Sequence, residues 1–158
     1  MKIVQINDQT DLVLDEEQVE SLVREVCRLE GIDGDELYLN FITKEKISDL
    51  HRDYFEDPSV TDCITFPLDG PRFVECVEGL KASPHIIGEV FVCPQVAFES
   101  CPHAPYEELS LYIVHTLLHL AGYNDIEEAD TFEMRDAEKR ILGYLYEKDL
   151  VLRQPMVL

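Results

Sequence analysis

The sequence predicts an α+β fold, in which a small mixed four-stranded sheet is flanked by about five helices. Three observations support this prediction. Four short segments are rich in β-branched and aromatic residues, four longer segments repeat apolar residues with the helical period, and the two kinds do not strictly alternate. With 158 residues, 46% of them hydrophobic and 29% charged, the chain is expected to form a single domain, residues 1–158.

The N-terminal elements are predicted to be a strand and an amphipathic helix. The opening segment KIVQI is typical of a short strand. In the segment LDEEQVESLVREVCRLEGI, Asp15 is placed to cap a helix and Gly31 is placed to end it. The apolar residues of this helix share one face, and they are Val19, Leu22, Val23, Val26 and Cys27.

Three further strands and a short helix are predicted in the middle of the chain. ELYLNFI is typical of a second strand, and DCITFP and IIGEVFVC are typical of a third and a fourth. Thr43 is placed to cap a short helix, which the EDP sequence stops before Pro58. Residues 68–85 contain glycines and prolines without clear periodicity, and they predict a long loop of the kind that is usually functional or mobile.

The C-terminal half predicts a central buried helix followed by an amphipathic one. Pro105 begins the first of these helices, with Glu107 and Glu108 in a first turn where negative charge is favourable. From residue 109 to residue 121 the segment is apolar nearly all round, which indicates burial on every side, and Gly122 is expected to end it. The last helix carries an apolar stripe of Met134, Ala137, Ile141 and Leu145.

Composition narrows the possible partners. The chain has 33 acidic against 13 basic residues and a formal net charge of −20, so it repels nucleic acid at long range, and DNA is not expected as a partner. No apolar stretch approaches the roughly 20 residues that cross a bilayer, so no membrane partner is expected. The N-terminus lacks a secretion signal, which favours the cytoplasm. The five cysteines include no C-x-x-C pair and are expected to be small buried apolar residues.

The segment HTLLHLAGYND, residues 115–125, predicts a metal site at the end of the central helix. His115 and His119 share one helix face, at a spacing that lets both imidazoles bind one Zn²⁺. Gly122 stops the helix, so Asp125 can return a carboxylate to the same point and leave an open coordination position, as in catalytic zinc sites. The alternative is a pair of core histidines that hydrogen-bond to their surroundings. Thr116 stands where H-E-x-x-H proteases carry a general base, which argues against a protease.

Four segments, spread over roughly residues 45–140, match the motifs of a known family in order. HTLLHLAGYND is similar to H-G-x-L-H-L-x-G-Y-D-H, and LHRDYFEDPSVTDCITFP is similar to L-N-x-x-Y-R-x-K-D-x-P-T-D-V-L-S-F-P. GEVFVCPQVA is similar to a G-D-I-x-I-x-x-x-x-A block, and EMRDAE is similar to the M-x-x-x-E that follows the metal motif. The chain therefore resembles the YbeY family of bacterial rRNA maturation factors, which are described as zinc-dependent endoribonucleases.

The resemblance implies a small mixed sheet flanked by helices, with a metal at one end of a groove. It also implies cleavage of single-stranded RNA in 16S rRNA 3′-end maturation and ribosome quality control, with rRNA as substrate and the ribosome or ribosomal proteins as partners. The first two ligands of the family carry over to His115 and His119, whereas Asp125 stands in place of the third histidine and Asn124 in place of the aspartate before it. Zn²⁺ is expected, and Fe²⁺ or another divalent metal is the alternative, because two histidines and a carboxylate suit both.

A second departure concerns the phosphate contact. The family's Y-R dipeptide is Tyr54-Phe55 here, so the arginine that would hold a phosphate is missing. Arg52, one helical turn earlier, is the candidate substrate-binding residue, and its alternative is an exposed helix arginine. With Lys44 and Lys46 it would form a local basic patch that faces RNA. A second basic cluster, Arg135, Lys139 and Arg140, is predicted to be the solvated face of its helix.

No catalytic base is identified by the sequence. Asp62, Glu89 and Glu138 lie in segments that resemble the family, and each is as well suited to a structural hydrogen bond. Two functions from different classes follow. The first is a single-strand-specific, metal-dependent endoribonuclease of rRNA maturation. The second is a ribosome-associated assembly factor that retains a structural metal but has little catalytic activity, which the net charge of −20 and Phe55 favour.

Overall fold

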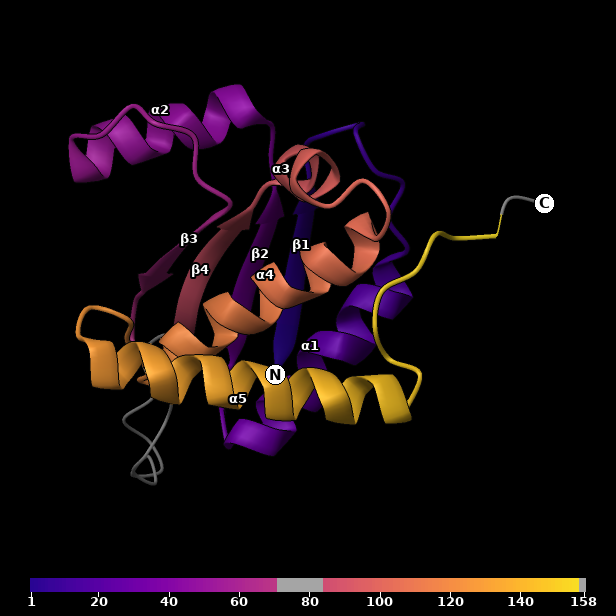
Figure 1. The fold of residues 1–158 in the computed structure, drawn as a ribbon. Coiled ribbons are helices and arrows are strands. Elements are labelled where there is room, and N and C mark those ends of the chain that lie inside the picture. The colour runs from indigo at the N-terminus through magenta and orange to yellow at the C-terminus, as the bar shows by residue number, and fades with distance from the viewer. Residues whose placement is uncertain (71–83, 157–158) are drawn as a thin grey trace.

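The strands form the predicted mixed sheet in a computed structural model that describes residues 1–70 and 84–156 (Figure 1). Their bounds are β1 (Lys2–Asn7), β2 (Glu36–Phe41), β3 (Cys63–Pro67) and β4 (Ile86–Val92). In the sheet order β1-β2-β4-β3, β2 pairs in parallel with β1 and β4, while β3 pairs antiparallel with β4. Most of the loop predicted at 68–85 lies outside the described residues.

The helices begin and end largely where local sequence directs them. Their bounds are α1 (Glu16–Glu30), α2 (Lys44–Phe55), α3 (Pro94–Ser100), α4 (Pro105–Leu120) and α5 (Glu128–Glu147). The Asp15 carboxylate accepts hydrogen bonds from two backbone amides of α1, and Gly31 ends that helix at φ 67°. Thr43 caps α2 by accepting from the Lys46 amide. The sequence did not locate α3, whose seven residues are too few to show a period.

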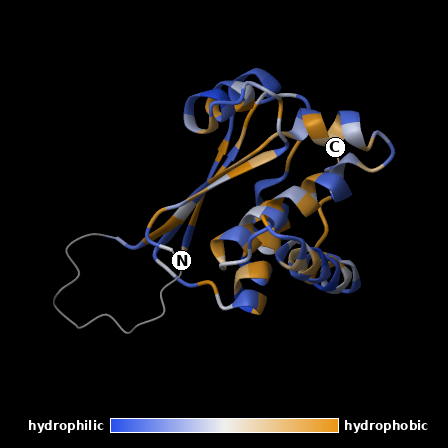
Figure 2. Ribbon diagram, turned by 60° about the vertical axis from the view of Figure 1, so that its left-hand side comes forward, coloured by the Kyte–Doolittle hydropathy of each residue, from blue (hydrophilic) through white to orange (hydrophobic). Residues whose placement is uncertain are grey.

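Helix α4 is buried on nearly every side, as predicted. It lies across β3 and β4 and also packs against α1, α3 and α5. Its two fully buried hydroxyls both donate to backbone carbonyls of the same helix, Ser110 Oγ to Tyr106 at 2.8 Å and Thr116 Oγ1 to Ile113 at 2.7 Å. Ser110 Oγ also accepts a hydrogen bond from the Leu152 amide at 3.0 Å. Thr116 therefore points into the helix packing and not toward solvent. Figure 2 shows apolar segments gathered between the sheet and the helices beside it.

Helix α2 is attached to the rest of the molecule by a small apolar cluster of its own. This cluster is built by Ile42, Ile47, Ile64 and Cys93, and it is distinct from the main core. Ile47 is the only residue of α2 that is fully buried, so the helix projects beyond the end of the sheet with its C-terminal half exposed (Figure 1). No helix in the described ranges is long and apolar enough to cross a membrane.

Glycine at position 88 is required by the close approach of α4 to β4. A Cβ on Gly88 would lie 2.5 Å from Leu120 Cδ2 and 2.9 Å from the Phe66 carbonyl oxygen, and that backbone atom cannot move aside. We expect Gly88→Ala to lower the free energy of unfolding by about 1–3 kcal/mol, measured by urea denaturation. The matched control is Gly143→Ala in α5, where an added Cβ would meet nothing within 4 Å. This substitution should raise the free energy of unfolding by about 0.5–1 kcal/mol, because alanine favours the helix more than glycine does. Similar losses from both substitutions would contradict the packing explanation.

Candidate metal centre

The end of α4 is built to turn the chain back on itself. The helix ends at Leu120, and Gly122 adopts a φ of 106°, a conformation that side chains disfavour. The Gly122 amide donates to the His119 carbonyl at 3.1 Å and the Tyr123 amide donates to the Leu118 carbonyl at 3.0 Å. The reversal predicted at Gly122 is therefore present, and it brings Asp125 back beside the last turn of α4.

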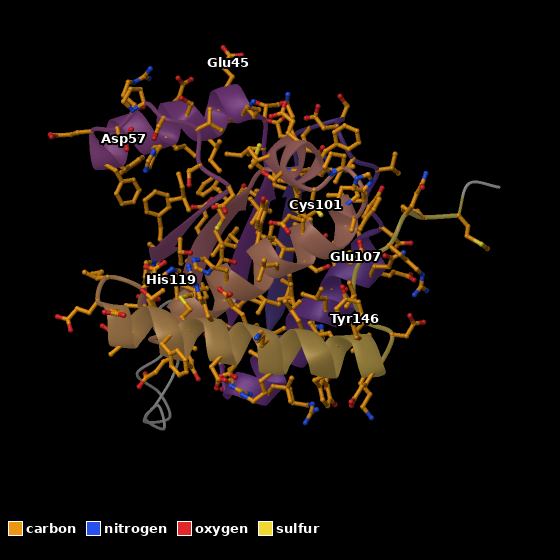
Figure 3. All side chains as sticks on the ribbon, in the orientation of Figure 1. Glu45, Asp57, Cys101, Glu107, His119 and Tyr146 are labelled. Carbon is orange, nitrogen blue, oxygen red and sulfur yellow. The ribbon has the colours of Figure 1, made fainter. Side chains whose placement is uncertain are left out.

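Three ligand atoms converge at this turn. His115 Nε2 lies 3.1 Å from His119 Nε2, and Asp125 Oδ2 lies 3.6 Å from the first and 3.7 Å from the second. Ligands at about 2.0–2.1 Å from a tetrahedral zinc are about 3.3–3.4 Å apart, so the observed triangle is close to what such an ion requires. In Figure 3, His119 lies beside the N-terminal part of α5, on the same side of the molecule as Asp57 at the end of α2.

Hydrogen bonds at the opposite ring nitrogens fix both imidazoles. His115 Nδ1 lies 2.6 Å from Glu138 Oε1, and His119 Nδ1 lies 3.1 Å from the Tyr123 carbonyl oxygen. Both partners can only accept, so each Nδ1 carries the proton and each neutral ring directs an Nε2 lone pair at the other. Two such lone pairs 3.1 Å apart repel each other unless a proton or a metal cation lies between them. Core histidines satisfied by their surroundings would not require this arrangement.

The electrostatics of the site favour a cation. Burial disfavours the charged form of His115, but the hydrogen bond with Glu138 and the nearby charges of Glu138, Asp125 and Asp62 outweigh it and raise the pKa of His115. Burial lowers the pKa of His119, and the neighbouring His115 lowers it further. When the histidine pair takes up a proton, His115 therefore binds it more readily than His119, and a metal ion would compete with that proton. Metal binding consequently weakens as the pH falls through the raised pKa of His115.

A cavity of about 390 Å³ opens onto the three ligand atoms. One wall is formed by His51 and Phe55 of α2, and another by the segment 61–67, which includes β3. Phe55 is 53% exposed, and its ring lies 5.4 Å from the His51 ring. Cys63 also lines the cavity, where burial and the adjacent Asp62 raise the pKa of its thiol well above the usual range, and it is not part of the group of converging ligand atoms.

Comparison with known proteins identifies the family. The family model described as Endoribonuclease YbeY matches residues 4–146. The chain belongs to this family. An Endoribonuclease YbeY of Protochlamydia amoebophila is 41% identical over 93% of this chain and 95% of that protein, and one of Chlamydia muridarum is 35% identical over 92% and 89%. The solution structure of TM1509 from Thermotoga maritima covers 99% of both chains with a TM-score of 0.58, and at 22% identity it supports the fold alone.

The resemblance of the sequence to YbeY is thus confirmed, and with it an enzyme family of RNA-cleaving hydrolases. Of the predicted site residues, the structure brings together His115, His119 and Asp125 as a group that can hold a metal ion. Arg52 lies on the exposed side of α2, where its guanidinium is 3.2 Å from both Asp49 and Asp53, and it does not line the cavity.

The basic patch predicted around Arg52 is neutralised in the same way. Lys44 pairs with Glu99 at 2.7 Å, and Lys46 pairs with Asp8 at 2.8 Å. Each of these cations therefore lies against a carboxylate, which leaves little free positive charge on α2.

The three carboxylates considered as bases have different positions. Glu138 is engaged by His115 Nδ1, and Glu89 accepts from the Asn40 side chain at 3.1 Å. Asp62 lines the cavity, where its Oδ1 accepts a weak hydrogen bond from the Cys63 thiol at 3.3 Å. Sequence reasoning did not assign Glu138 its partner, although the family-like M-x-x-x-E spacing had singled it out. The contribution of the Tyr123 carbonyl carried no sequence signal at all, because any residue supplies a carbonyl.

The pairing of Glu138 with His115 predicts an effect on metal affinity. Glu138→Gln keeps the shape of the side chain but lets the amide present either an oxygen or a nitrogen to His115 Nδ1, so the ring is held less firmly and becomes less basic. We expect a 10- to 100-fold loss of zinc affinity at neutral pH, measured by competition with a chromogenic chelator. The control is Glu133→Gln, an exposed residue of the same helix that should bind zinc as the wild type does. Equal affinities for the wild type and Glu138→Gln would show that Glu138 does not support the ligand.

Proposed function

We propose that this YbeY-family chain is a metal-dependent endoribonuclease that cleaves single-stranded RNA in the cavity beside α2. The observation that carries the proposal is the convergence of His115 Nε2, His119 Nε2 and Asp125 Oδ2 at the floor of an open cavity. Family membership supports RNA as the substrate. Action in 16S rRNA 3′-end maturation and ribosome quality control, contact with the ribosome or ribosomal proteins, and a cytoplasmic location are further parts of the proposal, supported by the resemblance alone.

In this proposal His115, His119 and Asp125 hold Zn²⁺, with Fe²⁺ or another divalent metal as the alternative. A divalent cation bound there supplies Lewis acidity, which activates water and offsets the charge of the phosphate. The chain itself supplies orientation. The Glu138 carboxylate and the Tyr123 carbonyl hold the imidazoles with Nε2 toward the cavity, so the ligand set is formed before any substrate arrives.

Asp62 is the candidate general base of the proposal. Apart from Asp125, it is the one carboxylate among the described residues that line the cavity. Glu138 and Glu89 are already engaged by His115 and Asn40, whereas among the described residues the side-chain donor to Asp62 is a thiol, which binds weakly. Asp62 is therefore free to accept a proton from water as it attacks the phosphorus atom. Arg52 stays a prediction as a phosphate contact, since it would first have to leave Asp49 and Asp53.

A second candidate function, an assembly factor with a structural metal and little catalysis, is favoured by two observations. The net charge of −20 opposes encounter with RNA, and Phe55 occupies a cavity wall where the family motif has an arginine. Both candidates require the same three ligands, so metal content alone does not separate them. Cleavage does.

The proposal predicts that metal and cleavage are lost together. Purified wild-type protein should carry about one zinc or iron per chain and cut a labelled single-stranded RNA, a chelator should stop the reaction, and added Zn²⁺ should restore it. His119→Ala should lose both properties, and Asp125→Ala should bind metal markedly more weakly. The matched control is His103→Ala, an exposed histidine outside the group, which should keep both. Metal-loaded wild type that leaves RNA intact would support the assembly factor instead.

Restoring the arginine of the family motif at position 55 should increase activity. Phe55 is 53% exposed on the cavity wall, so an arginine there remains solvated and leaves the protein folded, while its guanidinium can grip a phosphate. We expect Phe55→Arg to raise kcat/KM on single-stranded RNA about tenfold at low salt, which corresponds to about 1.4 kcal/mol.

The matched control for this substitution is Phe98→Arg on α3, where the phenyl group is 51% exposed and does not line the cavity. It adds the same charge and should leave the rate nearly unchanged. A folded, metal-loaded Phe55→Arg protein that cleaves no faster than the Phe98→Arg protein would remove position 55 from the phosphate path.

A further inference from the structure

A second hollow, distinct from the metal cavity, lies between α4 and α5. Its volume is about 590 Å³, and its floor is apolar, formed by Leu111 of α4 with Phe132 and Leu142 of α5. Arg135 and Lys139 line it as well, one helical turn apart on α5. We call this hollow the α4–α5 groove. It combines an apolar surface with two adjacent cations.

The two cations of the groove differ from most others in the chain. Among the described basic residues, those on α1 and α2, together with Arg140 and Arg153, form ion pairs with acidic side chains. Arg135 and Lys139 form no ion pair within the described ranges. The basic cluster that the sequence placed on one solvated face is therefore divided, because Arg140 is held by Glu30 at 3.0 Å while the other two face the groove.

Two carboxylates also line the groove, but neither forms an ion pair with Arg135 or Lys139. Glu138 lines the groove, but its Oε1 lies 2.6 Å from His115 Nδ1 and is occupied there. Asp136, which follows Arg135 in the chain, is the other acidic residue of the lining, and it forms no ion pair with either cation. The lining is therefore neutral in sum, and in a protein of net charge −20 it is a place where a phosphate group can contact two cations that no carboxylate of the described residues holds.

The apolar part of the groove suits an unpaired base. Phe132 is 74% exposed, although the apolar stripe of the same helix, Met134, Ala137, Ile141 and Leu145, is buried. Exposed aromatic rings beside cations are the arrangement by which proteins hold single-stranded nucleic acid, because every base offers a face for stacking and every linkage offers a phosphate. A double helix, whose bases are already stacked, cannot use the ring in this way.

The groove and the metal cavity share no lining residue, but they are neighbours. Leu111 precedes His115 by one turn of α4, and Glu138 both lines the groove and contacts His115. A strand whose scissile phosphate lies at the ligand triangle can therefore continue past Glu138 and reach Arg135 and Lys139 on α5.

We propose that the α4–α5 groove binds the part of a single-stranded RNA substrate that flanks the scissile phosphate. Arg135 and Lys139 contact successive phosphates, and a base lies on Phe132 against Leu111 and Leu142. The identity of the ligand as RNA rests on the proposed function, whereas the groove itself uses none of the metal ligands.

The test measures the affinity of zinc-loaded protein for a fluorescein-labelled, uridine-rich 12-nucleotide RNA by fluorescence anisotropy at 4 °C. A gel confirms that the RNA remains intact. Arg135→Gln/Lys139→Gln should weaken binding about tenfold at low salt and reduce the slope of log Kd against log salt by about 1.4, or about 0.7 for each lost phosphate contact. Phe132→Ala should weaken binding about fivefold or more and leave that slope unchanged, because stacking releases no counterions.

The matched control is Lys2→Gln/Lys148→Gln, which also removes two basic residues that form no ion pair with any residue the structure describes and do not line the groove. Both double variants change the net charge from −20 to −22, so any difference between them comes from position and not from overall charge. The control should bind the RNA within a factor of two of the wild type. Melting temperature and zinc content, measured for every variant, should match the wild type.

The outcomes separate the groove from the proposed activity. Groove variants that lose affinity, in a protein that never cleaves RNA, would support the groove and contradict the nuclease. Groove variants that bind like the wild type, in a protein that does cleave, would overturn the groove, and an acidic protein segment would then be its better occupant. Equal losses in the groove and control variants would also overturn the proposal, since they would reflect net charge alone.

Discussion

The burial of α4 is the constraint on which the rest of the molecule depends. Packed against the sheet on one side and against α1, α3 and α5 elsewhere, this helix has no free surface along most of its length. Its fully buried Ser110 and Thr116 hydroxyls donate to backbone carbonyls of the helix itself, and neither lines the cavity. Only the half-buried His115 and His119 present polar atoms at the cavity, and the neighbours of α4 therefore decide where those atoms point. Glu138 comes from α5, and Asp125 comes from the turn that leads into it.

Acidity shapes the site as much as packing does. Three carboxylates, from Asp62, Asp125 and Glu138, act on the two imidazoles, and their combined charge attracts a divalent cation while opposing a polyanion. Ion pairs elsewhere add to the repulsion of a polyanion, because each lysine and arginine of α1 and α2 lies against an acidic partner. Such exposed pairs contribute little stability, but they remove positive charge that RNA could otherwise use. Recognition of RNA must then rely on short-range contacts at the few places where a cation is free.

Local signals in the sequence predicted most of the elements correctly. Caps and glycines set the limits of α1 and α2, and apolar periodicity identified the buried stripe of α5, because these features depend on neighbours in the chain. The ligand triangle was predictable for the same reason, since a four-residue helical spacing and one reversal at Gly122 are local geometry. The two walls of the cavity and the pairing of Glu138 were not predictable, because they require the packing of α2, β3 and α5 around α4.

The basic residues of α5 show most clearly that contacts between distant segments cannot be predicted from local sequence. In the sequence, Arg135, Lys139 and Arg140 form one cluster, and nothing local distinguishes them. One residue of difference rotates a helical side chain by about 100°, and that rotation carries Arg140 to Glu30 on α1 while the other two face α4. Whether a cation is neutralised or available is thus decided by the opposing surface, which only the fold supplies.

The two departures from the family motif have a common consequence. Asp125 in place of a histidine lowers the charge of the ligand set by one, and Phe55 in place of an arginine removes a positive charge from the opposite wall of the cavity. Both changes weaken the hold on a phosphate at the scissile bond. The free cations of the α4–α5 groove lie on the other side of the metal centre, beyond Glu138. Binding there acts on parts of the strand that do not react, and such remote interactions can position the scissile phosphate at the ligand triangle even where the cavity itself attracts it weakly.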